Sequence, residues 1–483
     1  MSRPAIPLRP IRPSGPCRLH AGSARATPLR PLPPCAIPSP NGSRSTGHPR
    51  PTSRLLTASL LATVALVLLT HLPASLAAPR LRQADTPFLN ARLIFPPEHW
   101  HNHGSTLIET RRGDLLVCWF HGSGERRADD VVIRGARLRR GAGTWSEPFL
   151  LADTPGYPDT NCTLFLDGQG RLWLIWPTIL ANLWESALLK YRISDDFERP
   201  GPPRWKQDGV LHVTPGPEFQ EAVQAWLPSV ERRLESDPMP DSMRREVERY
   251  LDVFRHQVED KLYLRLGWMT RAHPYLHEGH RIILPLYHDG FSCSLMAVSD
   301  DHGATWTTTA PLLGGGNIQP HILQRRDGSL VAYMRDNGPP PKRVPQSESR
   351  DGGLTWSPVT NSDIPNPGAG TDGVVLHDGR WLFIGNDTES GRHRLVVMLS
   401  DDDGLTWSHR RALEDDPPGP LAGRYHYPSI LQSRDGTLHV TYSHHLSTAR
   451  TDLPLDGHGK PAHSSIKHAH FNIAWVLAGE RLP

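Results

Sequence analysis

A tight turn containing glycine, followed by an apolar run rich in strand-forming residues, recurs six times along the chain. The copies are RGDLLVCWF (112–120), DGQGRLWLIW (167–176), EGHRIILPLY (278–287), DGSLVAYM (327–334), DGRWLFIG (378–385) and DGTLHVTY (435–442). Each predicts a β-strand that follows a hairpin turn. Four of the five intervals between them are 49–57 residues, and the second-to-third interval is 111. Repeats of this period predict a six-bladed β-propeller, an all-β fold, with one insertion.

A second repeat supports the same architecture. The pattern Ser-x-Asp-x-Gly-x-Thr-Trp occurs at 299–306, 349–356 and 400–407, with starts 50 and 51 residues apart. The Asp can accept hydrogen bonds from turn amides, and the Gly allows a positive φ. The Trp offers a large apolar surface for packing between neighbouring sheets. We therefore interpret this motif, hereafter the turn motif, as part of the scaffold and not of the chemistry.

The long interval contains a segment with a different period, at about 216–258. Val247, Leu251, Phe254 and Val258 recur at three- to four-residue spacing, which predicts an amphipathic helix. The segment is expected to be a helical excursion packed on the propeller. It could also form a wall or lid over the binding site, because long insertions often build binding surfaces.

The first 78 residues have no such pattern. Residues 1–54 contain thirteen Pro and nine Arg and no Lys, Asp or Glu, a composition typical of disordered segments or of an over-long gene model. Residues 55–78 combine a preceding Arg54, an uncharged run of 16 residues and a small-residue end, SLAA. This is the layout of a signal peptide cleaved near Ala77–Ala78, or else of a signal anchor. The propeller, 79–483, is thus expected to be secreted, periplasmic or membrane-anchored outside the cytoplasm.

Charge and cysteine content exclude some functions. The net charge of +3 comes from the nine arginines of residues 1–54; the rest of the chain has 44 basic and 50 acidic residues. Nucleic acid is therefore not an expected partner. Three cysteines, Cys118, Cys162 and Cys293, lie in the propeller region without paired spacing. This argues against a disulfide framework or a zinc site and favours buried free thiols.

With these repeats the chain resembles the sialidase (neuraminidase) superfamily, in its branch of predicted exo-α-sialidases with Asp-box, or BNR, repeats. The resemblance covers roughly residues 90–475. Stretches typical of the branch are HNHGSTLIE, GSGERRADDVVIRGARL, GGGNIQPHILQRRDGSLVAYMRDNGPPPK, NPGAGTDGVVLHDGR, YHYPSILQSRDGTLHVTYS and SIKHAHFN. The resemblance implies a glycan substrate and no cofactor. Because a fold does not determine a function, the site residues need a separate argument.

The resemblance implies three catalytic or binding positions. Tyr427, with Tyr425 as the alternative, precedes the last hairpin, where sialidases place a nucleophilic Tyr. A neutral phenol can attack an anomeric carbon beside a carboxylate, which would repel an anionic nucleophile. Asp130, with Asp129 as the alternative, follows GSGERRA and resembles the acid/base of the family. Arg335 resembles one member of the family's three-arginine carboxylate clamp, and its planar fork suits that ligand.

The first blade departs from the family pattern. Classical sialidases begin it with an Arg-Ile-Pro run whose Arg belongs to the clamp, whereas this chain has HNHGSTL with His103 at the matching place. Arg126 and Arg271 are weaker candidates for the clamp, and no third Arg is obvious. His103 instead offers an acid or base near neutral pH. Together with Arg335 it could serve elimination on a uronate, so a lyase or glycosidase acting on uronate-containing polysaccharide remains an alternative.

Further polar residues precede predicted strands, where loops would lead into a central channel. Asn161, Asn317, Gln319 and Asp372 suit hydrogen bonding to sugar hydroxyls, and Asp372 could also be the carboxylate partner of Tyr427. No metal site is expected, despite His463, His468 and His470 near the C-terminus. The sequence thus predicts a glycoside hydrolase of sialidase type that removes terminal acidic sugars. The alternatives are the His-based enzyme on uronate-containing glycans and a non-catalytic glycan-binding propeller.

Overall fold

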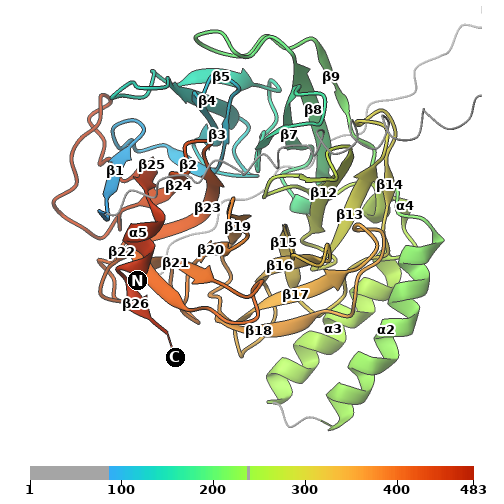
Figure 1. Ribbon diagram of the computed structural model, residues 1–483. Helices are drawn as coiled ribbons and strands as arrows, with labels where there is room; N and C mark the ends of the chain where they lie inside the picture. The colour runs from blue at the N-terminus through green and yellow to red at the C-terminus, as the bar shows by residue number, and fades with distance from the viewer. Residues whose placement is uncertain (1–85, 237–239, 483) are drawn as a thin grey trace, which may run out of the picture. The chain divides into compact units, whose positions relative to one another are not determined.

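Six antiparallel sheets surround a central axis (Figure 1) in the part of the chain that the computed structural model describes, residues 86–236 and 240–482. The expected six-bladed β-propeller is confirmed. The six apolar runs predicted from the sequence form β3, β7, β12, β16, β20 and β24. Each is the second strand of its blade, flanked on both sides within the sheet and therefore almost fully buried. Burial explains why these strands gave the clearest apolar pattern.

The strands of each blade follow one another along the chain, apart from the closing strands of blades 5 and 6. Blade 1 contains β2 (His101–Glu109), β3 (Leu115–Gly122), β4 (Val132–Leu138) and β5 (Phe149–Ala152). Blade 2 contains β6 (Thr163–Leu166), β7 (Leu172–Ile179), β8 (Ala187–Ser194) and β9 (Gln207–Val210). Blade 3 contains β10 (Trp268–Met269), β11 (Tyr275–His277), β12 (Arg281–His288), β13 (Cys293–Ser299) and β14 (Thr307–Thr308).

The second half of the ring repeats this arrangement. Blade 4 contains β15 (Asn317–Gln324), β16 (Leu330–Asp336), β17 (Arg343–Ser349) and β18 (Thr360–Pro365). Blade 5 contains β19 (Asp372–Val375), β20 (Trp381–Gly385), β21 (Arg394–Ser400), β22 (His409–Asp415) and β26 (Glu480–Arg481). Blade 6 contains β23 (Arg424–Gln432), β24 (Leu438–His445), β25 (Ser464–Phe471) and, at its outer edge, β1 (Leu89–Leu93). A short helix, α5 (Ile473–Leu477), follows blade 6.

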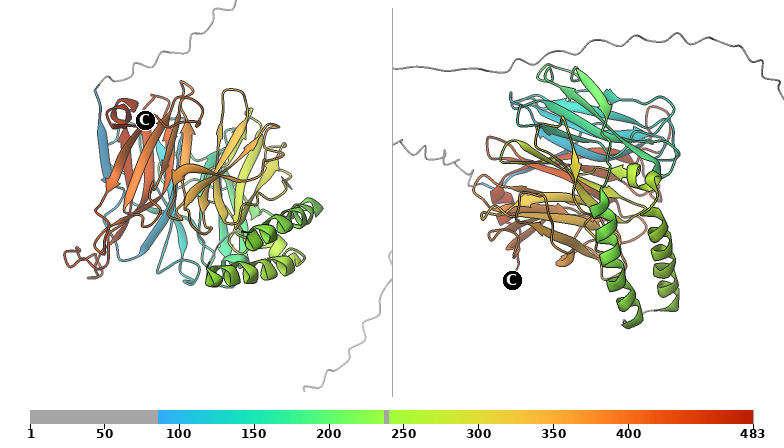
Figure 2. Two further views of the ribbon diagram at one scale, coloured as in Figure 1. Left: turned by 90° about the horizontal axis from the view of Figure 1, so that it is seen from below. Right: turned by 90° about the vertical axis from the view of Figure 1, so that its right-hand side faces the viewer.

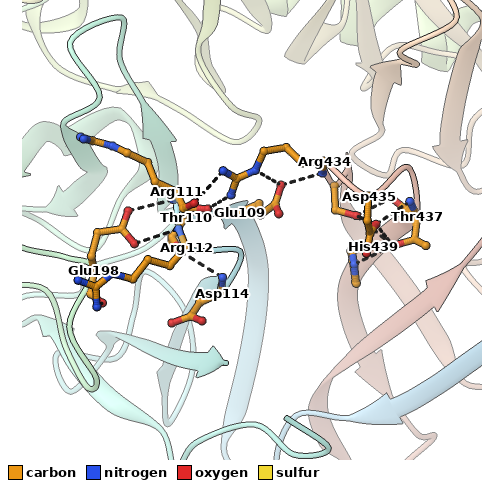
Figure 3. Close-up of polar contacts among 11 residues, drawn as sticks. Glu109, Thr110, Arg111, Arg112, Asp114, Glu198, Arg434, Asp435, Thr437 and His439 are labelled. Atoms are coloured by element: carbon orange, nitrogen blue, oxygen red, sulfur yellow. Dashed lines mark hydrogen bonds and ion pairs between the residues drawn. The ribbon is translucent and has the colours of Figure 1, made fainter. Parts of the chain in front are cut away.

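The ring is closed by its first strand. β1 pairs antiparallel with β25, from Leu89 opposite Phe471 to Leu93 opposite Lys467. The turns of neighbouring blades are joined as well (Figure 3): Arg434 of blade 6 donates to the carbonyls of Thr110 and Arg111 and to the Glu109 carboxylate. Glu198 of blade 2 accepts from the backbone amide of Arg111 at 2.9 Å. These contacts between turns therefore join blade 6 to blade 1 and blade 1 to blade 2.

The turn motif behaves as its chemistry predicted. In the first copy the Asp301 carboxylate accepts hydrogen bonds from the Thr305 amide at 2.8 Å and the Thr305 hydroxyl at 2.6 Å. Gly303 has φ +87°. All three copies connect the third strand of a blade to its fourth. They lie on one face of the propeller, opposite the loops that lead into the innermost strands, because strands alternate in direction.

Replacing Gly303 by Ala is expected to destabilise the protein more than replacing Gly141 by Ala. Both glycines have positive φ, +87° and +77°, and an L-residue there costs about 1 kcal/mol. Only at Gly303 would the new Cβ lie 2.5 Å from a buried side chain, the Trp173 ring, and such overpacking adds about 1–3 kcal/mol. Urea unfolding of both variants measures the difference. Equal losses would contradict this view of the motif.

The insertion is a helical hairpin, as expected. It consists of α2 (Pro217–Ser236) and α3 (Asp241–Gln257), followed by α4 (Lys261–Arg265), and it extends from one side of the propeller (Figure 2). Phe219 and Phe254 are fully buried against blade 3, and the Tyr250 hydroxyl donates to the Phe291 carbonyl at 2.6 Å. The hairpin joins the last strand of blade 2 to the first strand of blade 3. It therefore lies on the face opposite the turn motifs.

Cys118, Cys162 and Cys293 are buried free thiols, as the sequence indicated. The predicted tail and leader, residues 1–54 and 55–78, lie outside the described residues. None of the helices in the described part of the chain is both long and apolar enough to cross a membrane.

Candidate active site

The innermost strands share a local distortion near their start. In β2, β15 and β23 the pairing register shifts, between His103 and Thr106, Ile318 and His321, and His426 and Ser429 respectively. Each shift encloses a residue with positive φ: Gly104 at 63°, and Gln319 and Tyr427 at 54°. Asn161, directly before β6, has φ 41°. A positive φ strains the backbone of a residue other than glycine, and residues strained in this way cluster at functional sites.

The distorted residues meet across the channel at Tyr427. Gln319 Nε2 of blade 4 donates to the phenolic oxygen of Tyr427 in blade 6 at 3.1 Å, and Arg335 Nη1 donates to the same oxygen at 2.8 Å. Gln319 and Asn161 also donate to the Tyr287 hydroxyl, at 3.3 and 3.1 Å. Donors aimed at the Tyr427 oxygen stabilise the negative charge that develops there when its proton leaves. Four residues from three blades, Gln319, Arg335, Tyr287 and Asn161, thus form one hydrogen-bonded network with the potential nucleophile.

Three arginines surround the Tyr427 side chain. Besides Arg335, the guanidinium groups of Arg271 and Arg392 lie 5.0 and 5.6 Å from its ring centroid. Arg271 is 1% exposed, and its Nε and Nη1 have no hydrogen-bond partner; the same holds for Nε of Arg335. Buried guanidinium donors without partners are costly, so the site favours an anionic ligand that would accept from them.

His103 lies against the other side of Tyr427. The two ring centroids are 4.3 Å apart, and Nδ1 of His103 lies 2.8 Å from the Ser443 hydroxyl oxygen. Burial, together with His101, His445, Arg392 and Arg271, lowers the pKa of His103 well below its usual value. The imidazole is therefore neutral at pH 7. It lines a cavity of about 970 Å³ at the channel mouth, which also reaches Arg392 and Glu125.

Two carboxyl groups near the channel have different proton affinities. Burial raises the pKa of Asp289 to about 6, although the charges of Arg335 and Arg126 oppose the shift. For Glu125, burial acts in the same direction, but the hydrogen bond and charge of His101 outweigh it and lower the pKa. Pairs of groups whose environments separate their pKa values are typical of acid/base sites. Asp289 is thus protonated in part near neutral pH, while Glu125 is ionised.

The other residues singled out from the sequence make different contacts. Asp130 is exposed and accepts from the amide and hydroxyl of Ser123 in its own loop, at 3.1 and 2.9 Å. Asn317 donates to the Leu312 carbonyl at 2.8 Å. Arg126 lies with its guanidinium 5.1 Å from the Trp184 ring centroid.

Asp372 is buried and accepts from the Ile430 amide at 2.9 Å, with His273 Nδ1 at 3.6 Å. Among the described residues, the Tyr427 hydroxyl contacts Gln319 and Arg335, so the expected Asp372–Tyr427 pair is not seen. The Asp372 carboxylate joins the innermost strands of blades 5 and 6 instead.

Arg392, Asp289 and Glu125 were missed from the sequence. All three lie in loops that follow the second strand of a blade: β20–β21, β12–β13 and β3–β4. In an antiparallel blade, the end of the second strand lies beside the start of the first. Polar residues directly after each apolar run were thus the available signal.

The repeats agree with a known family. The model of the BNR repeat-like domain matches residues 113–225 and 253–440, which is more than half of the chain. The protein belongs to the BNR repeat-like family. The sialidase-superfamily resemblance of the sequence is thereby confirmed. The two matched segments of the BNR repeat-like domain leave out most of the helical hairpin, which marks the hairpin as an addition to the propeller.

The chain is similar to several sialidases, both in sequence and in fold. Anhydrosialidase of Macrobdella decora is 28% identical over 195 residues, 36% of this chain and 24% of that protein. Sialidase of Micromonospora viridifaciens is 26% identical over 188 residues, 37% of this chain and 25% of that protein. Each match thus spans about a quarter of the relative. The NanB sialidase of Streptococcus pneumoniae has a similar fold, with TM-score 0.56 and 14% identity over 80% of this chain and 71% of that chain.

Proposed function

We propose that the protein is a glycoside hydrolase of sialidase type, which removes terminal acidic sugars from glycans. The observation that carries the proposal is the group of Arg271, Arg335 and Arg392 around Tyr427, in which Arg271 and Arg335 have buried guanidinium donors that lack partners. A sugar carboxylate would accept from these donors and bring its neighbouring anomeric carbon to the phenolic oxygen. The similarity to sialidases supports this choice among acidic sugars.

The chemistry can be assigned to four side chains. Tyr427 attacks the anomeric carbon, and the neutral imidazole of His103 takes the phenolic proton. Asp289, with its raised pKa, donates a proton to the departing glycosidic oxygen and later activates water against the tyrosyl–sugar bond. Gln319 and Arg335 hold the phenolic oxygen in place. In this scheme Asp289 takes the role that the sequence assigned to Asp130.

The direct test is release of 4-methylumbelliferone from a panel of α-linked acidic sugars, sialosides first. Fluorescence that rises with enzyme concentration supports the proposal. A correctly folded protein, checked by circular dichroism, that releases nothing from any of them would remove the assignment. We expect natural substrates to be glycans outside the cytoplasm, which follows from the leader predicted at 55–78.

Replacing Arg392 by Met is expected to weaken binding of the acidic sugar and leave folding intact. Arg392 reaches the site from a loop, and hydrogen bonds to a charged group contribute about 1.5–3 kcal/mol, or roughly ten- to hundredfold in affinity. The readout is the Kd of the free acidic sugar by calorimetry. Arg350→Met, at an exposed arginine beside a turn motif, is the control. Equal affinities of the two variants would exclude Arg392 from the clamp.

A uronate lyase is a second candidate, because Tyr427 contacts Gln319 where a hydrolase of this type needs a carboxylate. In that reaction His103 would remove the proton at C5, the arginines would neutralise the uronate, and Tyr427 would protonate the leaving oxygen. Ultraviolet absorbance from an unsaturated uronate, formed on uronate-containing polysaccharides, would favour this function over hydrolysis.

A further inference from the structure

A groove separates the helical hairpin from the outer parts of blades 3 and 4. Its volume is about 740 Å³, and it is open to solvent. The helices contribute Trp226, Val230 and Leu234 from α2 and Met243, Val247 and Leu251 from α3. The opposite wall comes from the propeller, with Leu313, Pro339 and Val359. Figure 2 shows the two helices extending beyond the rim of the propeller.

The lining of the groove is apolar. Among the described residues it contains one charged side chain, that of Arg233. Val230, Met243 and Val247 are partly exposed along the groove, although the outer face of α3 presents charged residues on either side of Val253. Partly exposed apolar side chains that gather in one concave surface are typical of ligand-binding grooves.

The groove begins one side chain away from the catalytic centre. Arg335, which donates to the Tyr427 oxygen, also donates to Asn337 Oδ1 at 3.5 Å, and Asn337 donates to the Ser292 hydroxyl at 3.3 Å. Asn337 and Ser292 both line the groove. Ser292 belongs to the same short loop as Asp289, the assigned proton donor. A leaving group protonated by Asp289 would therefore depart toward this groove.

The cavity beside His103 and the groove beside Asn337 differ in chemistry. The cavity beside His103 is lined by histidines, Arg392, Arg424 and Glu125, and it suits a charged, hydroxylated sugar. We propose that the groove binds an apolar aglycone, so that the preferred substrate is an acidic sugar linked to a long alkyl or lipid alcohol. This inference rests on the proposed glycosidase function and specifies its substrate class.

The test is a series of glycosides with one acidic sugar and methyl, butyl or octyl aglycones. For the wild type, kcat/KM is expected to rise roughly two- to fourfold per methylene, the gain expected from burying alkyl surface. Val247→Lys places a charge in the groove and should abolish the rise of kcat/KM with the length of the aglycone. Leu313→Lys places a charge on the propeller wall of the groove and should have the same effect on kcat/KM. It replaces Val247→Lys as the test variant if Val247→Lys does not fold. Val253→Lys, at a residue of α3 that is 52% exposed, should behave as the wild type.

A kcat/KM that is independent of chain length in the wild type would overturn the inference, as would equal losses in Val247→Lys and Val253→Lys. A second measurement separates this failure from failure of the proposed function. Binding of octyl glucoside, below its micelle concentration, is followed through Trp226 fluorescence and needs no turnover. Turnover without octyl binding rejects the groove alone. If octyl glucoside binds but no acidic glycoside is cleaved, the proposed function is rejected and the aglycone assignment with it.

Discussion

The variant Tyr427→Phe is expected to lose at least about 10³-fold in kcat, because removing a nucleophile removes the reaction path that depends on it. The phenyl ring keeps its place between Arg271, Arg392 and His103, so binding of the acidic sugar should change little. The loss is therefore expected in kcat and not in the Kd of the free sugar. Steady-state kinetics with a fluorogenic glycoside, combined with calorimetry, measure both quantities.

Tyr425→Phe is the matched control for this variant. Tyr425 lies two residues earlier in the same strand, but its hydroxyl donates to Asp416 at 2.9 Å and its ring packs in the core shared by blades 5 and 6. Its removal should reduce stability and leave kcat intact. If Tyr425→Phe loses turnover and Tyr427→Phe keeps it, the assignment of the nucleophile is wrong. Full activity of both would exclude Tyr427 from the chemistry, as nucleophile of the hydrolase and as proton donor of the lyase alike.

The variant Asp289→Asn is expected to reveal the proton donor through the leaving group. An alkyl alcohol needs protonation as it departs, so kcat should fall about 10²–10⁴-fold for alkyl glycosides. A 4-methylumbelliferyl group leaves readily as an anion, so kcat/KM for that glycoside, which reports the first step, should be affected far less. In the wild type, activity on alkyl glycosides should decline as pH rises through about 6, where Asp289 loses its proton. This decline should be absent in the variant.

Two further variants test the alternatives for the acid. Asp130→Asn should keep its activity, because the Asp130 carboxylate is engaged within its own loop. Glu125→Gln should not reproduce the leaving-group effect, since the pKa of Glu125 is lowered. A selective loss on alkyl glycosides in Asp130→Asn would instead restore the assignment made from the sequence.

Asp289 also links stability to pH. An unfolded Asp has a pKa of about 3.9, whereas burial raises the pKa of Asp289 in the folded protein to about 6. The folded state therefore prefers the protonated form. Its contribution is fully present below the unfolded pKa and is lost as pH rises through about 6. Asp289→Asn should remove this part of the pH dependence in urea unfolding.

The fold was predictable because its signals are local. The glycine turns and the apolar runs after them identify each second strand, and the turn motif marks the passage from third to fourth strand. Several site residues were predictable too: Tyr427, Gln319, Asn161, His103 and Arg271 precede or begin innermost strands. Their common place in the blade puts all of them at one end of the channel.

The relations among these residues were not predictable. Gln319 and Tyr427 are 108 positions apart and belong to blades that are not neighbours. Their contact depends on the number of blades and on the positive φ of both residues, which no single stretch of sequence reveals. The burial that raises the pKa of Asp289 also depends on the assembled ring of blades, so no single stretch of sequence reveals it. The family resemblance selected Asp130, with Asp129 as the alternative, and did not single out Glu125 of the same loop; only the structure shows that Glu125 lines the cavity beside His103.

The closure of the ring by β1 sets the order in which the protein can mature. Residues 89–93 leave the ribosome long before their partners, residues 467–471. Until then the outer edge of the sixth blade does not exist, and β1 has nowhere to pair. A nascent or truncated chain therefore carries an unpaired strand, and unpaired strand edges are an aggregation hazard. Closure of so long a loop also slows this step, so we expect the protein to depend on chaperones until β25 is complete.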